Sequence, residues 1–425
     1  MTAGDVRRAP DAPELGPRPR VLLTGYSTDL VKALDSLLPP ASLVVLEEKE
    51  IFERRGLYKA ETAACVERVV FADYIQANDY RHAITTEALE RSFDAVFTGT
   101  EYTVPAAADL AEMFGLPGAS RSAAGCFATK VELRSAAGAG GVAGPRWAEV
   151  HSLADLERFA ADCDTDIVLK PADRAGSYGV RFLGVGTPLG PAWEALCQAP
   201  PDPMSCDRPL EHRYIAEQRM RGPEYSVEFL VSAGVPVFTN VTGKQVWPGD
   251  SPVERGHDVP APIAQETAHA LLAAMRTLVA ATGFQTGILH GEWILTADGP
   301  ALVECAARAP GDLIVGLIDL AYGIDTVKAL LDLYLGQPAD LPSRPVTNAA
   351  IRFLHARPGT VRQVRGVTEA SGLPGVHSVA VTASQGSEVR PLTSSWDRIG
   401  YVLATGQEAG AVAERGAGMV EVVTE

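Results

Sequence analysis

The sequence lacks any long apolar run. Across 425 residues no stretch approaches the roughly 18 consecutive apolar residues that a membrane-spanning helix requires, so we expect no transmembrane segment. Residues 1–19 are rich in proline, arginine and acidic side chains, where a secretory signal would place an apolar segment, and we expect them to form a disordered tail. Hydrophobic residues still make up 46% of the chain. That content predicts a large core divided among about two to four packed units.

Positive charge is also in short supply. The chain has 37 Lys and Arg residues against 53 Asp and Glu residues, which gives a net charge of −16 at pH 7. A broad surface for nucleic acid or for an anionic membrane needs an excess of positive charge, so the composition argues against both partners. Any polyanionic ligand must instead be bound by a few cations placed close to it.

Two common site motifs are absent. The six cysteines form no C-x-x-C pair, so neither a zinc site nor a disulfide framework is expected. We expect most of them to be small buried hydrophobic residues in a reducing cytoplasm. The phosphate-binding motif G-x-x-x-x-G-K-[ST] is also missing, because Gly243-Lys244-Gln245 has neither the upstream glycine nor the hydroxyl. P-loop chemistry is therefore excluded.

Short apolar runs alternate with amphipathic stretches from residue 20 onward. Over residues 20–120 this alternation predicts βαβ units and a parallel sheet. Strands and helices continue to alternate to about residue 335, and a proline-rich linker at 341–345 follows. Residues 345–425 contain alternating runs before a final helix and strand, which predicts a small α+β appendage. The expected fold class is therefore α/β and α+β, in several domains.

Two of three glycine-rich stretches favour ordinary turns. Gly25 follows the first predicted strand without the further glycines of a dinucleotide site, so a strand-to-helix turn is favoured over nucleotide binding. Residues 138–143 match G-x-G-x-x-A, but they follow a predicted helix and do not begin one. A helix C-terminus and loop explain that stretch better.

The third glycine-rich stretch, residues 167–180, is different. It places Lys170 at the end of an apolar strand and follows it with a loop containing Gly176 and Gly179. Glycines let backbone N–H groups approach an anion closely, and a nearby ammonium adds a point charge. A structural turn is the alternative, but a lysine that ends an apolar strand in such an acidic chain is poorly explained as solvated surface. We predict phosphate binding here.

A predicted β-hairpin carries a pair of acids. Two apolar strands meet at the turn Asp298-Gly299, with Glu292 and Glu304 in the strands on either side. In this arrangement the two carboxylates are able to face each other across the pair. Together with water and phosphate oxygens they suit Mg²⁺, which rarely uses an all-protein cage. The alternative is a ladder of surface side chains without a metal.

Taken in order, these features resemble the ATP-grasp superfamily over roughly residues 20–335. The resemblance implies a Rossmann-like N-terminal domain (20–120), two ATP-grasp subdomains (121–212 and 213–340) and a C-terminal ligase-type domain (345–425). It also implies ATP and Mg²⁺ as cofactors. The implied roles are phosphate binding by Lys130, Lys170, Gly176, Ser177, Gly179 and Val180, an adenine hinge at Glu217, Gln218 and Met220, ribose binding by Glu224, Mg²⁺ binding by Glu292 and Glu304, and stabilisation of the acyl phosphate or tetrahedral intermediate by Arg308.

One position departs from the common ATP-grasp pattern. Many members carry an asparagine metal ligand two residues after the second carboxylate, and here that position is Ala306. The resemblance therefore leaves open whether one or two metal ions bind. Cys305, beside Glu304, alternates away from the carboxylate face, and we expect it to pack in the core.

Further segments resemble the L-amino acid ligases, the bacilysin-type dipeptide synthetases. Residues 304–308 with Gly311 are similar to their E-x-A-A-R segment, residues 254–260 to their E-x-G-H-x-x-P segment, and the terminal region to their C-terminal domain. This implies an enzyme that joins the carboxylate of an amino acid to an amine through an acyl phosphate, releasing ADP and phosphate. Its partners would be small-molecule substrates, and dimers are common in the family.

The resemblance suggests two residues that would bind the amino acid. Glu254 would pair with its α-ammonium, and His257 would hold the substrate or deprotonate the incoming amine. A hydrogen-bonded loop histidine is the alternative for His257. Asp312 also has two interpretations, as an acidic wall of the substrate pocket and as the N-cap of a helix over 313–321. Two other functions compete: an ATP-grasp carboxylase or ligase for a non-amino-acid carboxylate, and a nucleotide-binding protein without catalysis.

Overall fold

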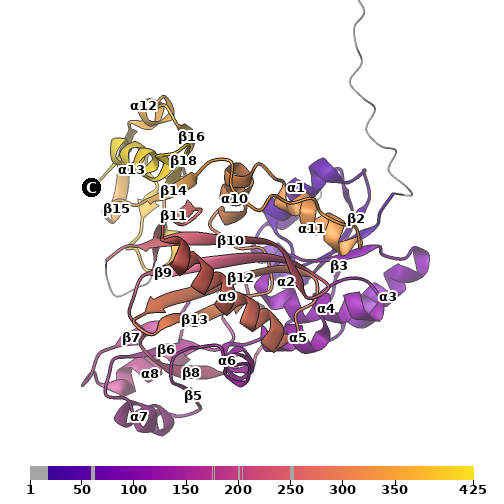
Figure 1. The fold of residues 1–425 in the computed structure, drawn as a ribbon, viewed down its shortest axis with the longest axis horizontal. Coiled ribbons are helices and arrows are strands. Elements are labelled where there is room, and N and C mark those ends of the chain that lie inside the picture. The colour runs from indigo at the N-terminus through magenta and orange to yellow at the C-terminus, as the bar shows by residue number, and fades with distance from the viewer. Residues whose placement is uncertain are drawn as a thin grey trace, which may run out of the picture.

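The computed structural model describes residues 18–58, 63–174, 176, 178–199, 202, 204–248 and 253–425. Nearly all of the expected tail and Ser177 lie outside these residues. Within the described part, the strands form four sheets. Figure 1 shows the N-terminal sheet and the C-terminal lobe at opposite ends of a large central sheet. No helix among the described residues combines the length and apolar character needed to cross a bilayer.

The N-terminal domain is the predicted parallel sheet. Its strand order is β3-β2-β1-β4, and β1 lies between its two neighbours with Val21 opposite both Leu43 and Ala95. Gly25, at φ +77°, begins the strand-to-helix turn that the sequence favours. The elements are β1 (Val21–Thr24), α1 (Thr28–Leu37), β2 (Leu43–Glu47), α2 (Lys49–Arg54), β3 (Val66–Phe71), α3 (Tyr80–Glu90), β4 (Ala95–Thr98), η2 (Glu101–Thr103) and α4 (Val104–Met113).

A second, smaller sheet follows two connecting helices. It has the antiparallel order β5-β8-β6-β7, with the apolar side chains of α7 and α8 packed against it. Helix α6 ends at Ala139 and Gly141 has a φ of +76°, so the 138–143 stretch is the predicted helix end and loop. The elements are α5 (Arg121–Cys126), α6 (Lys130–Ala139), β5 (Trp147–Val150), α7 (Leu153–Ala161), β6 (Ile167–Pro171), β7 (Arg181–Leu183), α8 (Leu189–Cys197) and β8 (Tyr214–Gln218).

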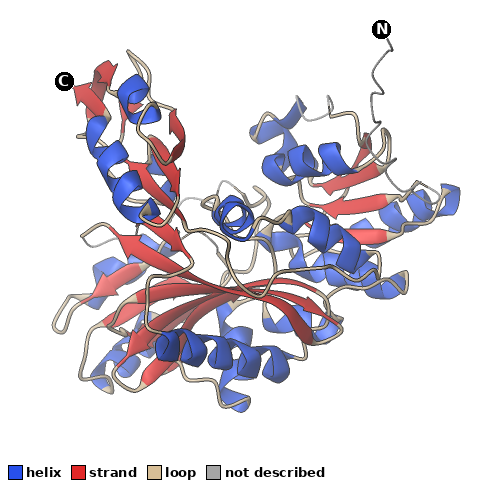
Figure 2. Ribbon diagram, turned by 45° about the horizontal axis from the view of Figure 1, so that its top comes forward, coloured by secondary structure: helices blue, strands red, loops and turns tan. Residues whose placement is uncertain are grey.

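The central sheet has eight strands in the order β13-β12-β9-β10-β11-β14-β18-β16. Helix α9 covers one face of this sheet (Figure 2). On that face Leu271 and Met275 belong to the same fully buried apolar cluster as Phe229 and Trp293. Its strands are β9 (Glu224–Ser232), β10 (Val235–Val246), β11 (Glu254–Val259), β12 (Gly287–Thr296), β13 (Gly299–Ala306), β14 (Ala349–Leu354), β16 (Val376–Val381) and β18 (Gly400–Thr405); α9 spans Gln265–Thr282.

The C-terminal α+β unit shares this central sheet. β14 pairs with β11 on one edge, His257 opposite Ile351, and with β18 on the other. The appendage expected from the sequence is thus continuous with the central sheet through backbone hydrogen bonds, and the linker only precedes it. Its other elements are β15 (Gly359–Arg365), α12 (Val367–Ser371), β17 (Glu388–Val389), η3 (Ser395–Asp397), α13 (Ala409–Met419) and β19 (Glu421–Thr424).

Two helices, α10 (Ile314–Tyr322) and α11 (Thr326–Tyr334), join the central sheet to the N-terminal domain. Tyr334 packs edge-on against Phe97 of β4, with ring centroids 4.8 Å apart. One apolar cluster therefore runs from β1 and β4 through α11 to β14. This shared core fixes the N-terminal domain against the face that carries the candidate site.

Candidate active site

The candidate residues gather on one face of the central sheet because side chains alternate along its strands. Val227 and Phe229 point into the α9 core, so Glu224, Ser226 and Glu228 point to the opposite face. Strand register continues this pattern across the sheet. Glu292 lies opposite Ser226 on one side and Glu304 on the other.

The hairpin of β12 and β13 has the register that the sequence predicts. Glu292 and Glu304 are direct partners, and Cys305 is buried in the α9 core as expected. The side chains of Glu292 and Glu304 are 30% and 34% exposed, so a ligand can reach both. Two accessible carboxylates on one face are a donor set that fits Mg²⁺, with Ala306 adding no third oxygen from its side chain.

Lys130 begins helix α6, whose N-cap Thr129 accepts a hydrogen bond from the Glu132 amide. The Lys130 ammonium lies 3.0 Å from the Glu304 carboxylate and donates a hydrogen bond to the Arg174 carbonyl at 2.7 Å. Burial alone would lower the pKa of Lys130, but the carboxylate of Glu304 outweighs it and raises the pKa. The first predicted phosphate lysine therefore stands charged beside a predicted metal carboxylate.

Lys170 ends buried strand β6, as predicted, and forms an ion triad. Its ammonium lies 2.7 Å from Glu217, which also accepts from Arg134 at 2.8 Å. Burial opposes the Glu217 charge, but these two cations lower the pKa of its carboxyl to about 2. The sequence predicted an adenine hinge at Glu217 but no contact of its carboxylate, so the triad was not foreseen. Arg134 follows Lys130 by one helical turn, a spacing that could have signalled it.

The glycine loop has the expected backbone conformation at its described residues. Gly176 and Gly179 have φ values of +66° and +78°, which side-chain-bearing residues rarely adopt. A Cβ on Gly179 would also lie 3.1 Å from Pro171. Val180 continues the chain into β7. The backbone needs glycine here, as a phosphate-binding loop would.

At the predicted adenine hinge, two main-chain amides are already engaged. The Gln218 amide donates to the Arg146 carbonyl and the Arg219 amide to the Asp166 carbonyl, both at 2.8 Å. Met220 follows in the turn before β9. The hinge thus holds β8 against its neighbours, and base recognition at Glu217, Gln218 and Met220 remains a prediction.

Lys244 lies at the centre of the active face, and sequence reasoning missed it. Its ammonium is 3.1 Å from Glu292, 3.2 Å from Glu254 and 3.3 Å from Glu224. Burial would lower the pKa of Lys244, but the three carboxylates raise it well above its usual value. The pKa of Glu292 lies well below its ordinary value because Lys244 and His290 outweigh the effect of burial.

A buried polar network supports Glu292 from beneath. His290, in strand β12, lies 3.0 Å from Glu228 and 3.7 Å from Glu292. Glu228 also accepts hydrogen bonds from Asn240 at 2.7 Å and Thr242 at 2.8 Å. Burial would lower the pKa of His290, but the two glutamates raise it to about 9.

His257 and Asp312 lie together, and the structure departs here from one of the two interpretations that the sequence left open for each residue. His257 belongs to strand β11 and not to a loop, and its Nε2 lies 3.2 Å from Asp312. Asp312 makes no N-cap: it and Leu313 have φ values of +56° and +59°, and α10 begins without a side-chain cap. The Asp312 carboxylate instead accepts two hydrogen bonds from Arg398, one at 2.9 Å.

These contacts neutralise the acidic wall expected at Asp312. Burial would raise the pKa of Asp312, but Arg398 and His257 hold it far below its usual range. The Arg398 guanidinium also stacks on Phe353, 3.7 Å from the ring centroid. Ser395, in the same C-terminal turn, donates to Glu254 at 2.8 Å. The C-terminal unit thus contributes side chains to the site.

Arg308 connects the site to the N-terminal domain. Its Nε lies 2.6 Å from Glu101, a residue that sequence reasoning missed. A cavity of about 860 Å³ opens beside this pair, lined by Glu101, Lys130 and Glu304 among others. Gly311 follows Arg308 in the loop before Asp312. One predicted phosphate lysine, Lys130, and one predicted metal carboxylate, Glu304, therefore line a space large enough for substrates.

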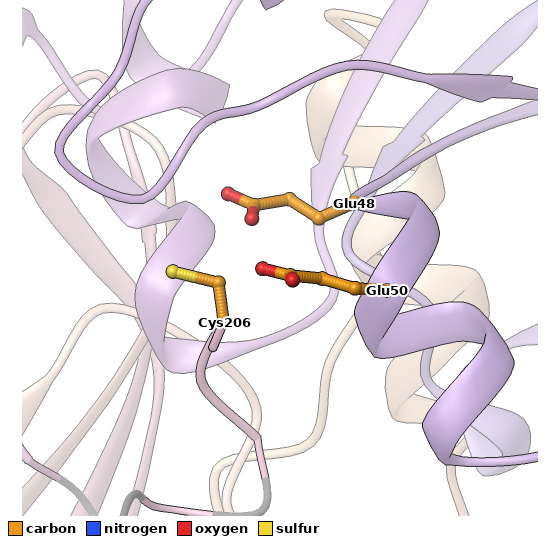
Figure 3. A group of neighbouring side chains, drawn as sticks. All are labelled: Glu48, Glu50 and Cys206. Carbon is orange, nitrogen blue, oxygen red and sulfur yellow. The ribbon is translucent and has the colours of Figure 1, made fainter. Parts of the chain in front are cut away.

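A further acidic group lies next to Cys206, which lines the cavity. Figure 3 shows Glu48, the N-cap of α2, and Glu50, in its first turn, close to Cys206 of a facing segment. Glu48 accepts from the amides of Tyr74 and Ile75 and from Arg208 at 3.0 Å. These donors already neutralise and occupy Glu48, so the group attaches the facing segment to the N-terminal domain.

Comparison with known proteins identifies the same two parts of the chain. The family model of the ATP-grasp domain matches residues 163–316, and that of the L-amino acid ligase C-terminal domain 2 matches residues 352–425. The structure is similar to the crystal structure of an L-amino acid ligase from Bacillus licheniformis, with a TM-score of 0.77, 20% identity, and coverage of 96% of this chain and 100% of that one. This likeness confirms the expected fold.

Curated relatives match a smaller part of the chain. An uncharacterised protein of Sinorhizobium fredii is 27% identical over 74% of this chain and 65% of its own length. An alanine–anticapsin ligase of Bacillus subtilis is 27% identical over 59% of this chain and 56% of its own length. The alignments thus span between about half and two thirds of these relatives. The chain therefore carries an ATP-grasp domain at residues 163–316 and an L-amino acid ligase C-terminal domain 2 at residues 352–425, the two families that its sequence resembles.

Proposed function

We propose that this protein is an ATP-dependent carboxylate–amine ligase that joins the carboxylate of an amino acid to an amine, with Mg²⁺ as its metal cofactor. The observation that carries the proposal is the shared sheet face. It brings the hairpin carboxylates Glu292 and Glu304 within reach of Lys130 on one side and Lys244 on the other. Glu254 and His257 extend the same face toward the C-terminal unit.

The first step would activate the carboxylate, which is a poor electrophile. One carboxylate oxygen attacks the γ-phosphorus of ATP, the bond from that phosphorus to the β,γ-bridging oxygen breaks, and ADP leaves with the bond's electron pair. Lys130, Lys170 and the amides of the 176–180 loop would stabilise negative charge on the phosphate oxygens. Mg²⁺ held by Glu292 and Glu304 would neutralise the transferring phosphoryl group.

The second step would form the amide. The amine nitrogen attacks the acyl carbon, the proton lost from nitrogen passes to a base, and the C–O bond to phosphate breaks with release of inorganic phosphate. Arg308 would stabilise the oxyanion on the tetrahedral carbon, a contribution of about 3 kcal/mol for one well-placed donor. His257 would hold the substrate or accept the proton, and Glu254 would bind the α-ammonium.

Phosphate release tests this proposal. Purified protein is incubated with ATP, Mg²⁺ and pools of L-amino acids, with and without bicarbonate, and product masses are recorded. We expect release that depends on amino acids and the appearance of an amide. Release that depends on bicarbonate would identify a carboxylase instead, and absence of release under every condition would contradict catalysis. Lys328→Ala, a change on the exposed face of α11, is the matched control.

A further inference from the structure

Lys244 is the most enclosed cation of the active face. Lys244 is one of seven lysines in the chain. Its side chain is only 5% exposed and contacts three carboxylates. Those carboxylates are less enclosed: the side chains of Glu224, Glu254 and Glu292 are 27%, 12% and 30% exposed. The ammonium therefore lies beneath a layer of acids that ligands can reach.

The charge balance exceeds what a structural ion pair requires. One carboxylate suffices to compensate one buried cation. Lys244 and the charged His290 together contact four carboxylates, which leaves two negative charges in excess. The four carboxylates are those of Glu224, Glu228, Glu254 and Glu292. Uncompensated negative charge in a partly buried site is unfavourable unless cations arrive. Under the proposed function, Mg²⁺ at Glu292 and a substrate ammonium at Glu254 are those cations.

A second observation points to a ligand at the same place. His257 lies directly opposite Lys244 in the ladder between β10 and β11. It is 2% exposed, and its Nδ1 has no hydrogen-bond partner in the part of the chain that the structure describes. Buried polar atoms are nearly always hydrogen-bonded, so an orphaned one beside Lys244 indicates a missing partner.

We propose that Lys244 binds the reacting carboxylate of the amino-acid substrate while Glu254 binds its α-ammonium. This inference rests on the proposed function. An α-amino acid carries opposite charges on neighbouring groups, so its site needs an anion and a cation a few ångströms apart. Glu254 and Lys244, 3.2 Å apart, supply that pair. Glu292, 3.1 Å from Lys244 on another side, places the held carboxylate next to the predicted metal site.

The role makes Lys244 a catalytic residue, because its ammonium would contact the oxygen that attacks phosphorus. On binding, the substrate carboxylate would take the place of Glu292 beside Lys244, which would leave Glu292 to help hold Mg²⁺. The substrate ammonium takes the place of Lys244 beside Glu254. Each exchange replaces one ionic contact by another, so no charge is left unpaired.

The test compares an amino acid with its carboxamide. The probes are the L-amino acid that gives the greatest phosphate release in the assay above and the same compound with a neutral amide in place of the carboxylate. Calorimetry on protein saturated with Mg²⁺ and ADP measures both affinities. For Lys244→Met we expect the affinity for the acid to fall on the order of ten- to a hundred-fold, the loss of one charged hydrogen bond, while that for the carboxamide stays nearly constant.

Other variants separate this role from a structural one. Lys244→Arg should keep a preference for the acid over the carboxamide, and Lys328→Met should change neither affinity. ADP affinity and thermal unfolding report whether each variant is folded, and Lys244→Gln carries the same comparison if Lys244→Met does not fold. The inference would be overturned if Lys244→Met lost affinity equally for the acid and the carboxamide, or if it lost affinity for ADP alone. Failure of the proposed function would give a different result, because the wild-type protein would then neither bind amino acids nor release phosphate in response to them.

Discussion

Lys130 and Lys170 are buried cations that each contact a carboxylate before any ligand binds. Glu304 lies beside Lys130 and Glu217 beside Lys170, so neither ammonium is unpaired in the interior. An unpaired buried charge would cost several kcal/mol, which these contacts avoid. The pairing keeps both side chains positioned where the phosphates of ATP are expected, so little reorganisation is needed on binding.

Lys170→Ala is expected to abolish ATP turnover. Removing the ammonium deletes one of the two predicted phosphate cations, and we expect phosphate release to fall at least on the order of 100-fold. Arg134 remains beside Glu217, so the variant should still fold, with some loss of stability. Lys328→Ala serves as the control. Near-normal phosphate release by Lys170→Ala would mean that this loop does not bind phosphate.

Glu217→Gln is expected to lose stability in a pH-dependent way. The pKa of Glu217 is about 2 in the folded protein, below its unfolded value, so its charge stabilises the fold above the unfolded pKa. That stabilisation declines as the pH falls toward about 2. We expect the variant to be less stable by about 3 kcal/mol at pH 7. Urea unfolding at pH 7, 4 and 3 measures the difference in the free energy of unfolding between the wild type and the variant. A difference that stays constant over this pH range would contradict the triad.

The position of a residue was predictable where a local pattern carried it, and the roles of the site residues stay predictions. Lys170 does end a buried strand before a glycine loop, as its sequence pattern indicated. Lys244 also lies within a strand, but no such loop follows it to draw attention to it. Asp312 looked like a helix cap, but the backbone there is left-handed and Arg398, 86 positions away, accounts for its contacts. No local pattern indicates which distant arginine will meet an acid.

At the scale of elements, the β12–β13 hairpin was the most predictable feature. Its Asp298-Gly299 turn and alternating strands set the register, and Glu292 indeed faces Glu304 despite a bulge beside Glu292. The pairing of β14 with β11 was not predictable, because hydrogen bonding between strands about 90 residues apart depends on the whole fold. The sequence therefore predicted the strands of the C-terminal unit without their place in the central sheet.

The hairpin acids give a prediction about divalent ions. Glu292→Gln and Glu304→Gln each keep the side-chain shape and remove one negative charge, so the apparent Mg²⁺ requirement should rise and turnover should collapse. Mn²⁺ binding followed by calorimetry gives a reading independent of activity. Asp298→Asn, in the exposed turn of the same hairpin, is the matched control. Unchanged Mg²⁺ dependence in both glutamine variants would refute the metal role.

At the scale of the whole molecule, the site is assembled from every part of the chain. Glu101 comes from the N-terminal domain, Lys130 from the segment before the small sheet, and Arg308 from the loop after β13. Arg398 comes from the C-terminal unit and reaches Asp312 across 86 positions of sequence. The continuous central sheet and the shared apolar core make this convergence possible, and the exact domain boundaries remain predictions.

Arg398→Ala is expected to change substrate preference. Removing the guanidinium leaves Asp312 as an acidic wall, since His257 is then its one remaining side-chain partner among the described residues. A carboxylate in a partly desolvated site favours amino or guanidino side chains. Phosphate release with single amino acids should shift toward cationic ones. Adding Asp312→Asn should reverse the shift, and exposed Arg415→Ala should leave the profile unchanged. An identical ranking in all variants would place this ion pair outside the substrate pocket.

Oxygen transfer from the amino acid to phosphate tests the central claim most directly. The preferred L-amino acid is labelled with ¹⁸O in its carboxylate, incubated with ATP, Mg²⁺ and the amine substrate, and the released phosphate is examined by mass spectrometry. Attack of the carboxylate on the γ-phosphorus predicts one ¹⁸O atom in each phosphate released and ADP as the nucleotide product. Phosphate free of label, or label appearing in AMP, would contradict an acyl-phosphate ligase.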